Sequence, residues 1–222
     1  MTPANLHRAW PALAIVFVLL ALYGAYVGQT EAEIAATRWI QDTTPAPLHT
    51  VADFMTFVGH SPVYPLTALV ACAALLLARR PSLALMLVAA TALRASSVLL
   101  KDLVDRPRPS PAFIDVATRI DNPSFPSGHV LGATLLYGFL VYAVEIAVPI
   151  NWIKRTLQTG LIMMIGLMGF ARVELGEHWP TDVVGGWAVG ALILIGLFRL
   201  HQRIAGGGRS QTPALAASPA GD

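Results

Sequence analysis

The chain has 222 residues, of which 55% are hydrophobic and only 13% are charged. An average soluble domain carries about 25% charged residues, so this composition, with a mean hydropathy of +0.60, excludes an ordinary soluble protein and indicates a membrane protein. The formal net charge of +2 is too small to indicate a nucleic-acid partner. Cys72 is the single cysteine, so no disulfide can form within the chain.

Six apolar stretches predict an all-α, polytopic membrane fold with six transmembrane helices. Each is near the roughly 17 to 25 residues that cross a bilayer as a helix, and Arg94 interrupts the third. Arg8 precedes the first stretch, so a signal peptide is an alternative for it, although no small-residue cleavage site follows. The stretches are residues 10–27, 61–78, 81–100, 130–144, 156–171 and 183–198.

The basic residues predict the orientation, because cytoplasmic loops carry an excess of Lys and Arg. With a cytoplasmic N-terminus, that side holds Arg8, Arg79, Arg80, Lys154, Arg155, Arg199, Arg203 and Arg209. We therefore expect an integral protein of the bacterial inner membrane with both termini in the cytoplasm. The opposite side holds most of the acidic residues and also Arg38, Lys101, Arg106, Arg108, Arg119 and Arg172.

One domain is expected over residues 1–203, followed by a tail over 204–222. The tail is rich in Gly, Ala, Ser and Pro, which cannot bury a core, and it is predicted to be disordered and cytoplasmic. Between the first two spans, apolar residues from Leu48 to Val58 fall on one helical face. They predict a short helix that either lies on the outer membrane surface or packs on the bundle as a lid. Residues 31–41 predict a second interfacial piece.

Three outer segments contain unusual polar residues: KDLVDRPRP at 101–109, PSGH at 126–129 and ARVELGEHWPTD at 171–182. The predicted topology puts all three on the same, extracytoplasmic side. Lys101, Arg108 and Arg172 would repel one another there unless an anion joined them. Because a guanidinium fork matches phosphate oxygens, a phosphate group is the simplest partner.

The PSGH segment stands directly before the apolar stretch that begins at Val130. We expect Ser127 and Gly128 to present backbone N–H groups at a helix N-terminus, which is a favourable anion site, although a serine there can also be a plain N-cap. His129 in the first turn can donate a proton to an oxygen that leaves the anion.

In the third segment Asp182 follows His178 by four positions, and Pro180 suits the first turn of a helix. A carboxylate at such a helix start can reach back to the imidazole, fix its tautomer and make the other nitrogen a better nucleophile. The alternative is an aspartate that only caps the helix beside an interfacial histidine.

Together, these segments resemble the three-part signature of the type 2 phosphatidic acid phosphatase (PAP2) superfamily. The resemblance implies that Lys101, Arg108, Ser127, Gly128 and Arg172 hold the phosphate, and that His178 attacks phosphorus to form a phosphohistidine. It also implies that Asp182 orients His178 and that His129 protonates the leaving oxygen. One position departs from the family pattern: Ala171 stands where a serine commonly precedes the arginine, so a hydrogen bond to Arg172 is expected to be missing.

Arg94 lies seven residues before Lys101, on the same helical face and about 10 Å deeper. An arginine at that depth should face the bundle interior or a wet cavity. It either lines the substrate pocket or bonds to carbonyls or to the hydroxyls of Ser96 and Ser97.

The expected function is hydrolysis of a lipid phosphate or diphosphate without metal or cofactor. Candidate substrates are undecaprenyl diphosphate, phosphatidic acid and phosphatidylglycerol phosphate. The alternatives are phosphotransfer to a lipid hydroxyl, vanadium-dependent haloperoxidase chemistry, and a transporter or scaffold without catalysis. The sequence indicates no oligomeric state.

Overall fold

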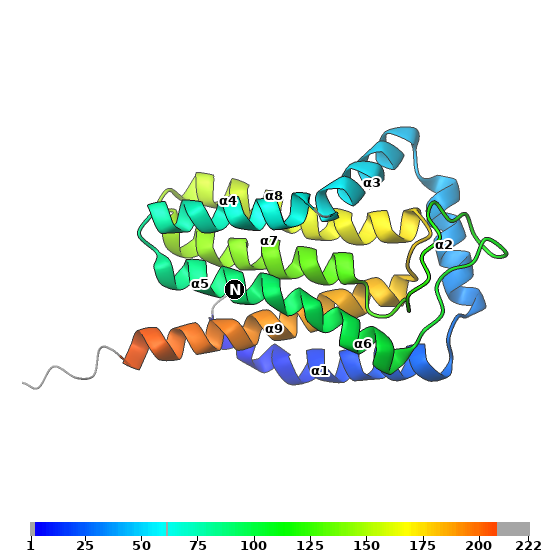
Figure 1. Cartoon of the computed structure of the whole chain (residues 1–222), viewed down its shortest axis with the longest axis horizontal. Helices are drawn as coiled ribbons and strands as arrows, with labels where there is room; N and C mark the ends of the chain where they lie inside the picture. Colours follow the sequence, from blue (N-terminus) through cyan, green and yellow to red (C-terminus); the bar gives the residue numbers. More distant parts are fainter. Residues whose placement is uncertain (1–2, 61, 208–222) are drawn as a thin grey trace, which may run out of the picture.

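The computed structural model describes residues 3–60 and 62–207, and every regular element in this part of the chain is a helix (Figure 1). This confirms the predicted all-α fold. The helices are α1 (Pro3–Tyr26), α2 (Glu31–Thr43), α3 (Ala46–Gly59), α4 (Val63–Leu77), α5 (Pro81–Ala92), the 3₁₀ turn η1 (Leu93–Ala95), α6 (Ser96–Val104), α7 (Gly128–Ala147), α8 (Asn151–Glu174) and α9 (Pro180–Gly207).

Five continuous helical segments are long and apolar enough to cross a membrane: Ala9–Tyr26, Pro81–Val104, Gly128–Ala147, Asn151–Glu174 and Pro180–Arg203. The prediction of six spans requires α3 and α4 to count as one, although their axes differ by 66°. Alone, α4 has 15 residues and is about 22 Å long, shorter than a bilayer core of about 30 Å. It ends before Arg79, which has a left-handed φ of 58°. Ser61, where this span was expected to begin, lies outside the described residues.

Helix α7 occupies the centre of the bundle. It packs against both α8 and α9, and 56% of its span is buried, against 6% for the span in α1. Its sequence has no charged residue before Glu145, as expected for a helix that is surrounded by others. Helix α1 instead packs on α9 at the edge of the bundle.

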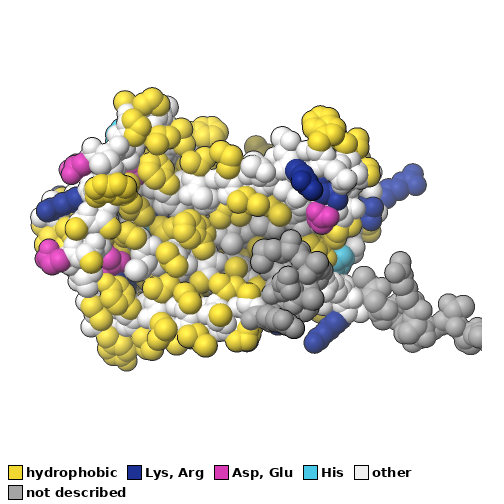
Figure 2. Space-filling model, turned by 180° about the vertical axis from the view of Figure 1, so that it is seen from behind, with side chains coloured by type: hydrophobic (Ala, Val, Ile, Leu, Met, Phe, Trp, Pro, Cys, Tyr) yellow, Lys and Arg dark blue, Asp and Glu magenta, His cyan; other side chains and the backbone are white. Residues whose placement is uncertain are grey.

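The outside of the bundle is apolar around its middle. Figure 2 shows hydrophobic side chains over most of one face, with charged side chains near the two ends. Exposed leucines and valines occur on several helices, for example Leu69 on α4 and Leu99 on α6. Such a surface suits lipid contact, because a bilayer core removes the cost of exposing apolar groups.

Helices α2 and α3 and the long segment after α6 lie together at one end of the bundle (Figure 1). Thr30 is the N-cap residue of α2, and its hydroxyl accepts a hydrogen bond from the backbone N–H of Glu33. The apolar face of α3 packs against α8 with Ala52, Met55 and Val58 buried. The contacts therefore match the lid alternative for α3, while Phe54 and Phe57 remain exposed on its other side.

The alternating direction of the helices brings the three polar segments to this same end. Helices α6 and α8 finish there, and α7 and α9 begin there (Figure 1). Helix α9 continues to Gly207, and the remainder of the expected disordered tail, residues 208–222, lies outside the described residues.

Candidate active site

His178 and Asp182 form the buried centre of the site. The Nδ1 atom of His178 lies 3.4 Å from Oδ2 of Asp182, and their side chains are only 2% and 0% exposed. The same Oδ2 also accepts hydrogen bonds from the hydroxyl of Ser124 and from the backbone N–H of Trp179, the latter at 2.9 Å. Asp182 thus caps α9 and also contacts His178, which combines the two alternatives drawn from the sequence.

The other imidazole nitrogen of His178 points toward Arg108. Its Nε2 lies 3.3 Å from an Nη1 atom that can only donate, so Nε2 carries the lone pair and Nδ1 carries the proton. Burial lowers the pKa of His178 to about 4, against the opposing effect of the Asp182 hydrogen bond, and the Arg108 charge lowers it further. The imidazole is therefore neutral at pH 7, as a nucleophile requires.

Lys101 and Arg108 are joined by Asn122. The Oδ1 atom of Asn122 accepts from Nζ of Lys101 at 3.1 Å and from Nη2 of Arg108 at 2.7 Å. Arg108 also donates to the carbonyl of Glu177 at 2.6 Å. Burial lowers the pKa of Arg108, and the carboxylates of Asp182 and Glu177 oppose this shift. An amide oxygen thus holds two like charges beside His178.

Arg172 is buried and held from two sides. Its guanidinium forms an ion pair with Glu177 and donates a hydrogen bond to the hydroxyl of Thr56 on α3. Its Nε is buried and has no hydrogen-bond partner among the described residues. Thr56 thus accepts a hydrogen bond from Arg172, whereas Ala171, which is fully buried, has no hydroxyl that could accept another.

Ser127 occupies the N-cap position of α7, as predicted, but its donors differ from the expectation. Its backbone N–H donates to the carbonyl of Asp182 at 3.1 Å and is not free for an anion. Its hydroxyl is buried without a hydrogen-bond partner among the described residues. The side chain of Ser127, together with the backbone N–H groups of Gly128 and His129 in the first turn, is therefore the available donor set.

His129, in the first turn of α7, lies against the last turn of α3. Its ring is 5.5 Å from the ring of His60 between centroids. A Cβ added at Gly59 would come within 2.7 Å of Cδ2 of His129, so glycine permits this close approach. Through Thr56 and Gly59, α3 contacts the side chains of both Arg172 and His129.

Arg94 of η1 lies against α7 at Gly132, about one turn past His129. Its guanidinium stacks over the ring of Tyr64 at 4.4 Å and lies 3.5 Å from the carbonyl of Gly59. A Cβ at Gly132 would lie 3.0 Å from its Cδ and Nε. The carbonyl contact agrees with one alternative from the sequence, whereas Ser96 and Ser97 do not bond to it.

Sequence reasoning missed several residues that hold the site. Arg106 pairs with Asp182 and with Glu33, each at 2.6 Å. The tandem RPRP and the NPS before PSGH are visible in the sequence, but Arg106 and Ser124 find their side-chain partners more than 50 positions away. Asn122 bonds nearer, to Lys101 and Arg108, which lie 21 and 14 positions before it. The missed residues are Glu33, Thr56, Arg106, Asn122, Ser124 and Glu177.

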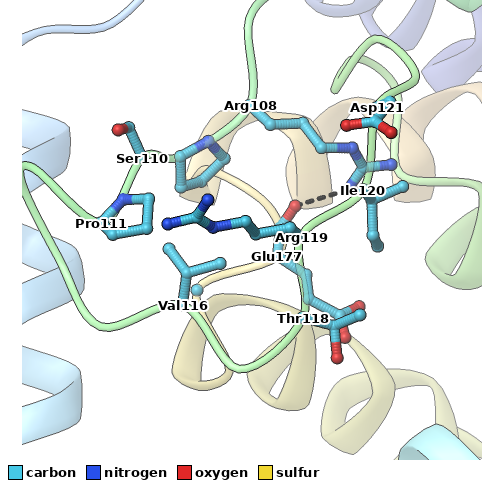
Figure 3. A pocket seen from close by; sticks show the side chains of 11 residues that line it. Arg108, Ser110, Pro111, Val116, Thr118, Arg119, Ile120, Asp121 and Glu177 are labelled. Carbon is cyan, nitrogen blue, oxygen red and sulfur yellow. Dashed lines mark hydrogen bonds between the residues drawn. The ribbon is translucent and has the colours of Figure 1, made fainter.

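A pocket of about 320 Å³ is lined in part by Arg108 (Figure 3). It lies between the segment 108–121 and the turn at Gly176 and Glu177, and Arg119 and Asp121 extend along it (Figure 3). The described residues contain no group of three or more His, Cys, Asp or Glu side chains that could hold a metal ion.

Comparisons with known proteins match the part of the chain that contains the three polar segments. The model of the PAP2 superfamily matches residues 81–205. The chain is 32% identical over 103 residues to phosphatidylglycerophosphatase B of Bacillus subtilis, covering 45% of this chain and 48% of that protein. It is 33% identical over 103 residues to a decaprenylphosphoryl-5-phosphoribose phosphatase of Mycobacterium tuberculosis, covering 45% and 50%. The chain thus matches about half the length of these relatives.

Two solved structures of membrane phosphatases also resemble this protein. A transmembrane PAP2-type phosphatidylglycerolphosphate phosphatase from Bacillus subtilis superposes with a TM-score of 0.76 at 25% identity, covering 88% of this chain and 96% of that one. LpxE from Aquifex aeolicus shares the fold with a TM-score of 0.59 at 21% identity, covering 79% and 98%. These matches and the apolar helices identify an integral membrane protein. Because the family model covers more than half of the chain and includes all three polar segments, the protein belongs to the PAP2 superfamily.

Proposed function

We propose that this protein is a membrane lipid phosphatase that works through a phosphohistidine at His178. The observation that carries the proposal is the placement of His178 between Asp182 on Nδ1 and Arg108 on Nε2. A neutral imidazole with a fixed tautomer is a nucleophile, and the arginine beside its lone pair attracts the phosphate that it would attack.

In the first step, Nε2 of His178 attacks phosphorus while the bond from phosphorus to the lipid oxygen breaks. The electron pair stays on the lipid oxygen, which takes a proton from His129. Asp182 stabilises the positive charge that appears on the imidazole of His178, because it accepts the hydrogen bond from Nδ1. In the second step, water loses a proton to His129 and attacks phosphorus, the bond to Nε2 breaks, and inorganic phosphate leaves.

The basic side chains supply the charge that the transferring phosphoryl group needs. Lys101, Arg108 and Arg172 approach from α6, from the segment after it and from α8. The free hydroxyl of Ser127 and the N–H of Gly128 add hydrogen bonds from the start of α7. We therefore propose hydrolysis without a metal ion or cofactor.

The relatives named above act on phosphatidylglycerol phosphate and on a polyprenyl phosphosugar. From these relatives we infer only a class of substrate for this protein: a lipid that carries a phosphate at the membrane surface, such as phosphatidylglycerol phosphate, phosphatidic acid or undecaprenyl diphosphate.

The charge bias of the loops supports an extracytoplasmic site and cytoplasmic termini. Cysteines introduced between residues 111 and 121, with Cys72 replaced, should react with an impermeant reagent from outside intact cells, and labelling from the inner face alone would refute this orientation.

The direct test of function is purified protein in detergent with a panel of lipid phosphates. Release of phosphate by the wild type, loss of release in His178→Ala, and a phosphorylated peptide containing residue 178 after a rapid alkaline, denaturing quench, in which phosphohistidine survives, would support the proposal. Phosphate release without any phosphorylated histidine, or undiminished release by His178→Ala, would refute the mechanism.

A further inference from the structure

Arg94 lies in the membrane-spanning segment Pro81–Val104 and has no anionic partner among the residues that the structure describes. Among the described residues its guanidinium has one long hydrogen bond, to the carbonyl of Gly59 at 3.5 Å, and no ion pair. An arginine within the bilayer is costly unless it is paired or lines a polar path. The other N–H groups of Arg94 are therefore suited to a ligand.

The position of Arg94 relates it to the leaving-group side of the site. It contacts Gly132, one helical turn past His129, and its guanidinium reaches the carbonyl of Gly59, which packs against the His129 ring. His129 is the proposed donor to the leaving oxygen. A group attached to that oxygen, on the side away from His178, would lie toward Arg94.

The depth of Arg94 also fits such a group. It precedes Lys101 by seven residues, so its Cα lies about 10 Å further into the membrane. Arg94 is held in place by Tyr64 below its plane and by the bare backbone of Gly132 beside it. The guanidinium of Arg94 is therefore held deeper in the membrane than the phosphate site, and not in the loops at the end of the bundle.

We propose that Arg94 binds a second phosphate, located in the leaving group of the lipid substrate. This inference rests on the proposed function and narrows its substrate class. It favours lipids with two phosphates, either adjacent as in a prenyl diphosphate or separated by glycerol as in phosphatidylglycerol phosphate, over lipids with one. A planar fork that donates two hydrogen bonds to phosphate oxygens gives this preference.

The test compares kcat/KM for substrates that differ by one phosphate but share their tails. One arm uses phosphatidylglycerol phosphate and phosphatidic acid, and the other uses a prenyl diphosphate and its monophosphate. In Arg94→Gln and Arg94→Met the ratio of two-phosphate to one-phosphate activity should fall about tenfold or more in at least one arm. The ratio for Arg94→Lys should lie between those of these variants and that of the wild type. The arm in which the ratio changes shows whether the two phosphates are adjacent or separated by glycerol.

A matched control is Arg80→Gln, which removes an arginine from the turn between α4 and α5 at the opposite end of the bundle. Its ratio should equal that of the wild type. Thermal unfolding in detergent separates the two roles for Arg94, because removing an unpaired charge from the membrane should leave Tm unchanged or higher. A lower Tm with equal losses on both substrates would mean that Arg94 only joins the helices, and would overturn the inference.

The wild type provides the remaining outcomes. If it hydrolyses phosphatidic acid but prefers no two-phosphate lipid in either arm, the inference is overturned and the proposed function stands. If it releases phosphate from none of the four substrates, the proposed function itself fails, and the inference fails with it.

Discussion

The guanidinium of Arg106 lies 2.6 Å from Oδ1 of Asp182, and both side chains are fully buried. The second arm of Arg106 pairs with Glu33 of α2 at 2.6 Å and also donates to the carbonyl of Gly28. Arg106 therefore connects the carboxylate that orients His178 to the helix that covers this end of the bundle. It acts on His178 through Asp182, as a positioning residue.

Replacing Arg106 by Gln should destabilise the protein and lower its activity. The change leaves two carboxylates buried without their charge partner, which costs about 3 to 5 kcal/mol in comparable cases. Glu33→Gln keeps the pair between Arg106 and Asp182 and should lower kcat less than Arg106→Gln does. Thermal unfolding in detergent and kcat would measure both effects, and equal kcat for the two variants would contradict the assigned link to Asp182.

The pair of Arg106 and Glu33 marks the limit of what the sequence could predict. The cations Lys101, Arg108 and Arg172, and the pair His178 and Asp182, were predictable because their spacing within each segment is short and diagnostic. The bundle was predictable from apolar length. By contrast, partners of Arg106 and Arg172 lie 73 and 116 positions away along the chain, and no local pattern encodes such distances.

Ser127 and α3 illustrate the same limit at shorter range. The sequence placed Ser127 correctly at the start of a helix, but could not show that the carbonyl of Asp182 takes its backbone N–H. The period of α3 predicted its apolar face. Whether the apolar face of α3 contacts lipid or protein depends on how α3 packs against α8, and this packing can be seen only in the structure.

Thr56 offers a second test, because its hydroxyl accepts a hydrogen bond from Arg172 and donates one to the carbonyl of Ala52 at 3.1 Å. Thr56→Val keeps the shape and removes the acceptor, so one guanidinium N–H loses its partner. We expect KM to rise about three- to tenfold with a smaller change in kcat. Thr56→Ser should recover the wild-type KM, and failure to do so would show that packing, not the hydrogen bond, matters.

The buried His178 predicts that acid weakens the protein. Its pKa is about 4 in the folded state and about 6.5 in an unfolded chain, so the unfolded state binds the proton first as the pH falls. The stabilising contribution is fully present above pH 6.5 and is lost as the pH falls toward 4. Between pH 7.5 and 4.5 this amounts to about 2 to 3 kcal/mol.

Unfolding at these two pH values, compared between the wild type and His178→Asn, would isolate the contribution of His178. The asparagine does not titrate, so the variant should lose less stability on acidification. An identical loss in both proteins would show that His178 is accessible to protons in the folded state.

His129 should matter most for substrates with poor leaving groups. Its proposed role is to protonate the lipid oxygen as the bond to phosphorus breaks, and an oxygen that leaves easily as an anion does not need the proton. The activity of His129→Ala should therefore be about 100-fold or more below that of the wild type on lipid phosphates, and should fall much less on phenyl phosphates with acidic phenols. A series of phenyl phosphates of graded acidity would measure the trend, and equal losses across the series would contradict the role of His129 as the acid.

Activity should persist in excess chelator and be blocked by vanadate at concentrations well below that of the substrate. The cations Lys101, Arg108 and Arg172 meet the charge of the transferring phosphoryl group, so removal of divalent ions should leave kcat unchanged within about twofold. Vanadate readily becomes five-coordinate and, with Nε2 of His178 as an axial ligand, resembles the transition state that the site should bind more tightly than the substrate. Arg108→Gln should weaken inhibition by vanadate more than it raises KM, because the lost charge acts mainly in the transition state. Activity that disappears in chelator and returns with magnesium, together with indifference to vanadate, would show metal-assisted hydrolysis and would refute the role given to these basic residues.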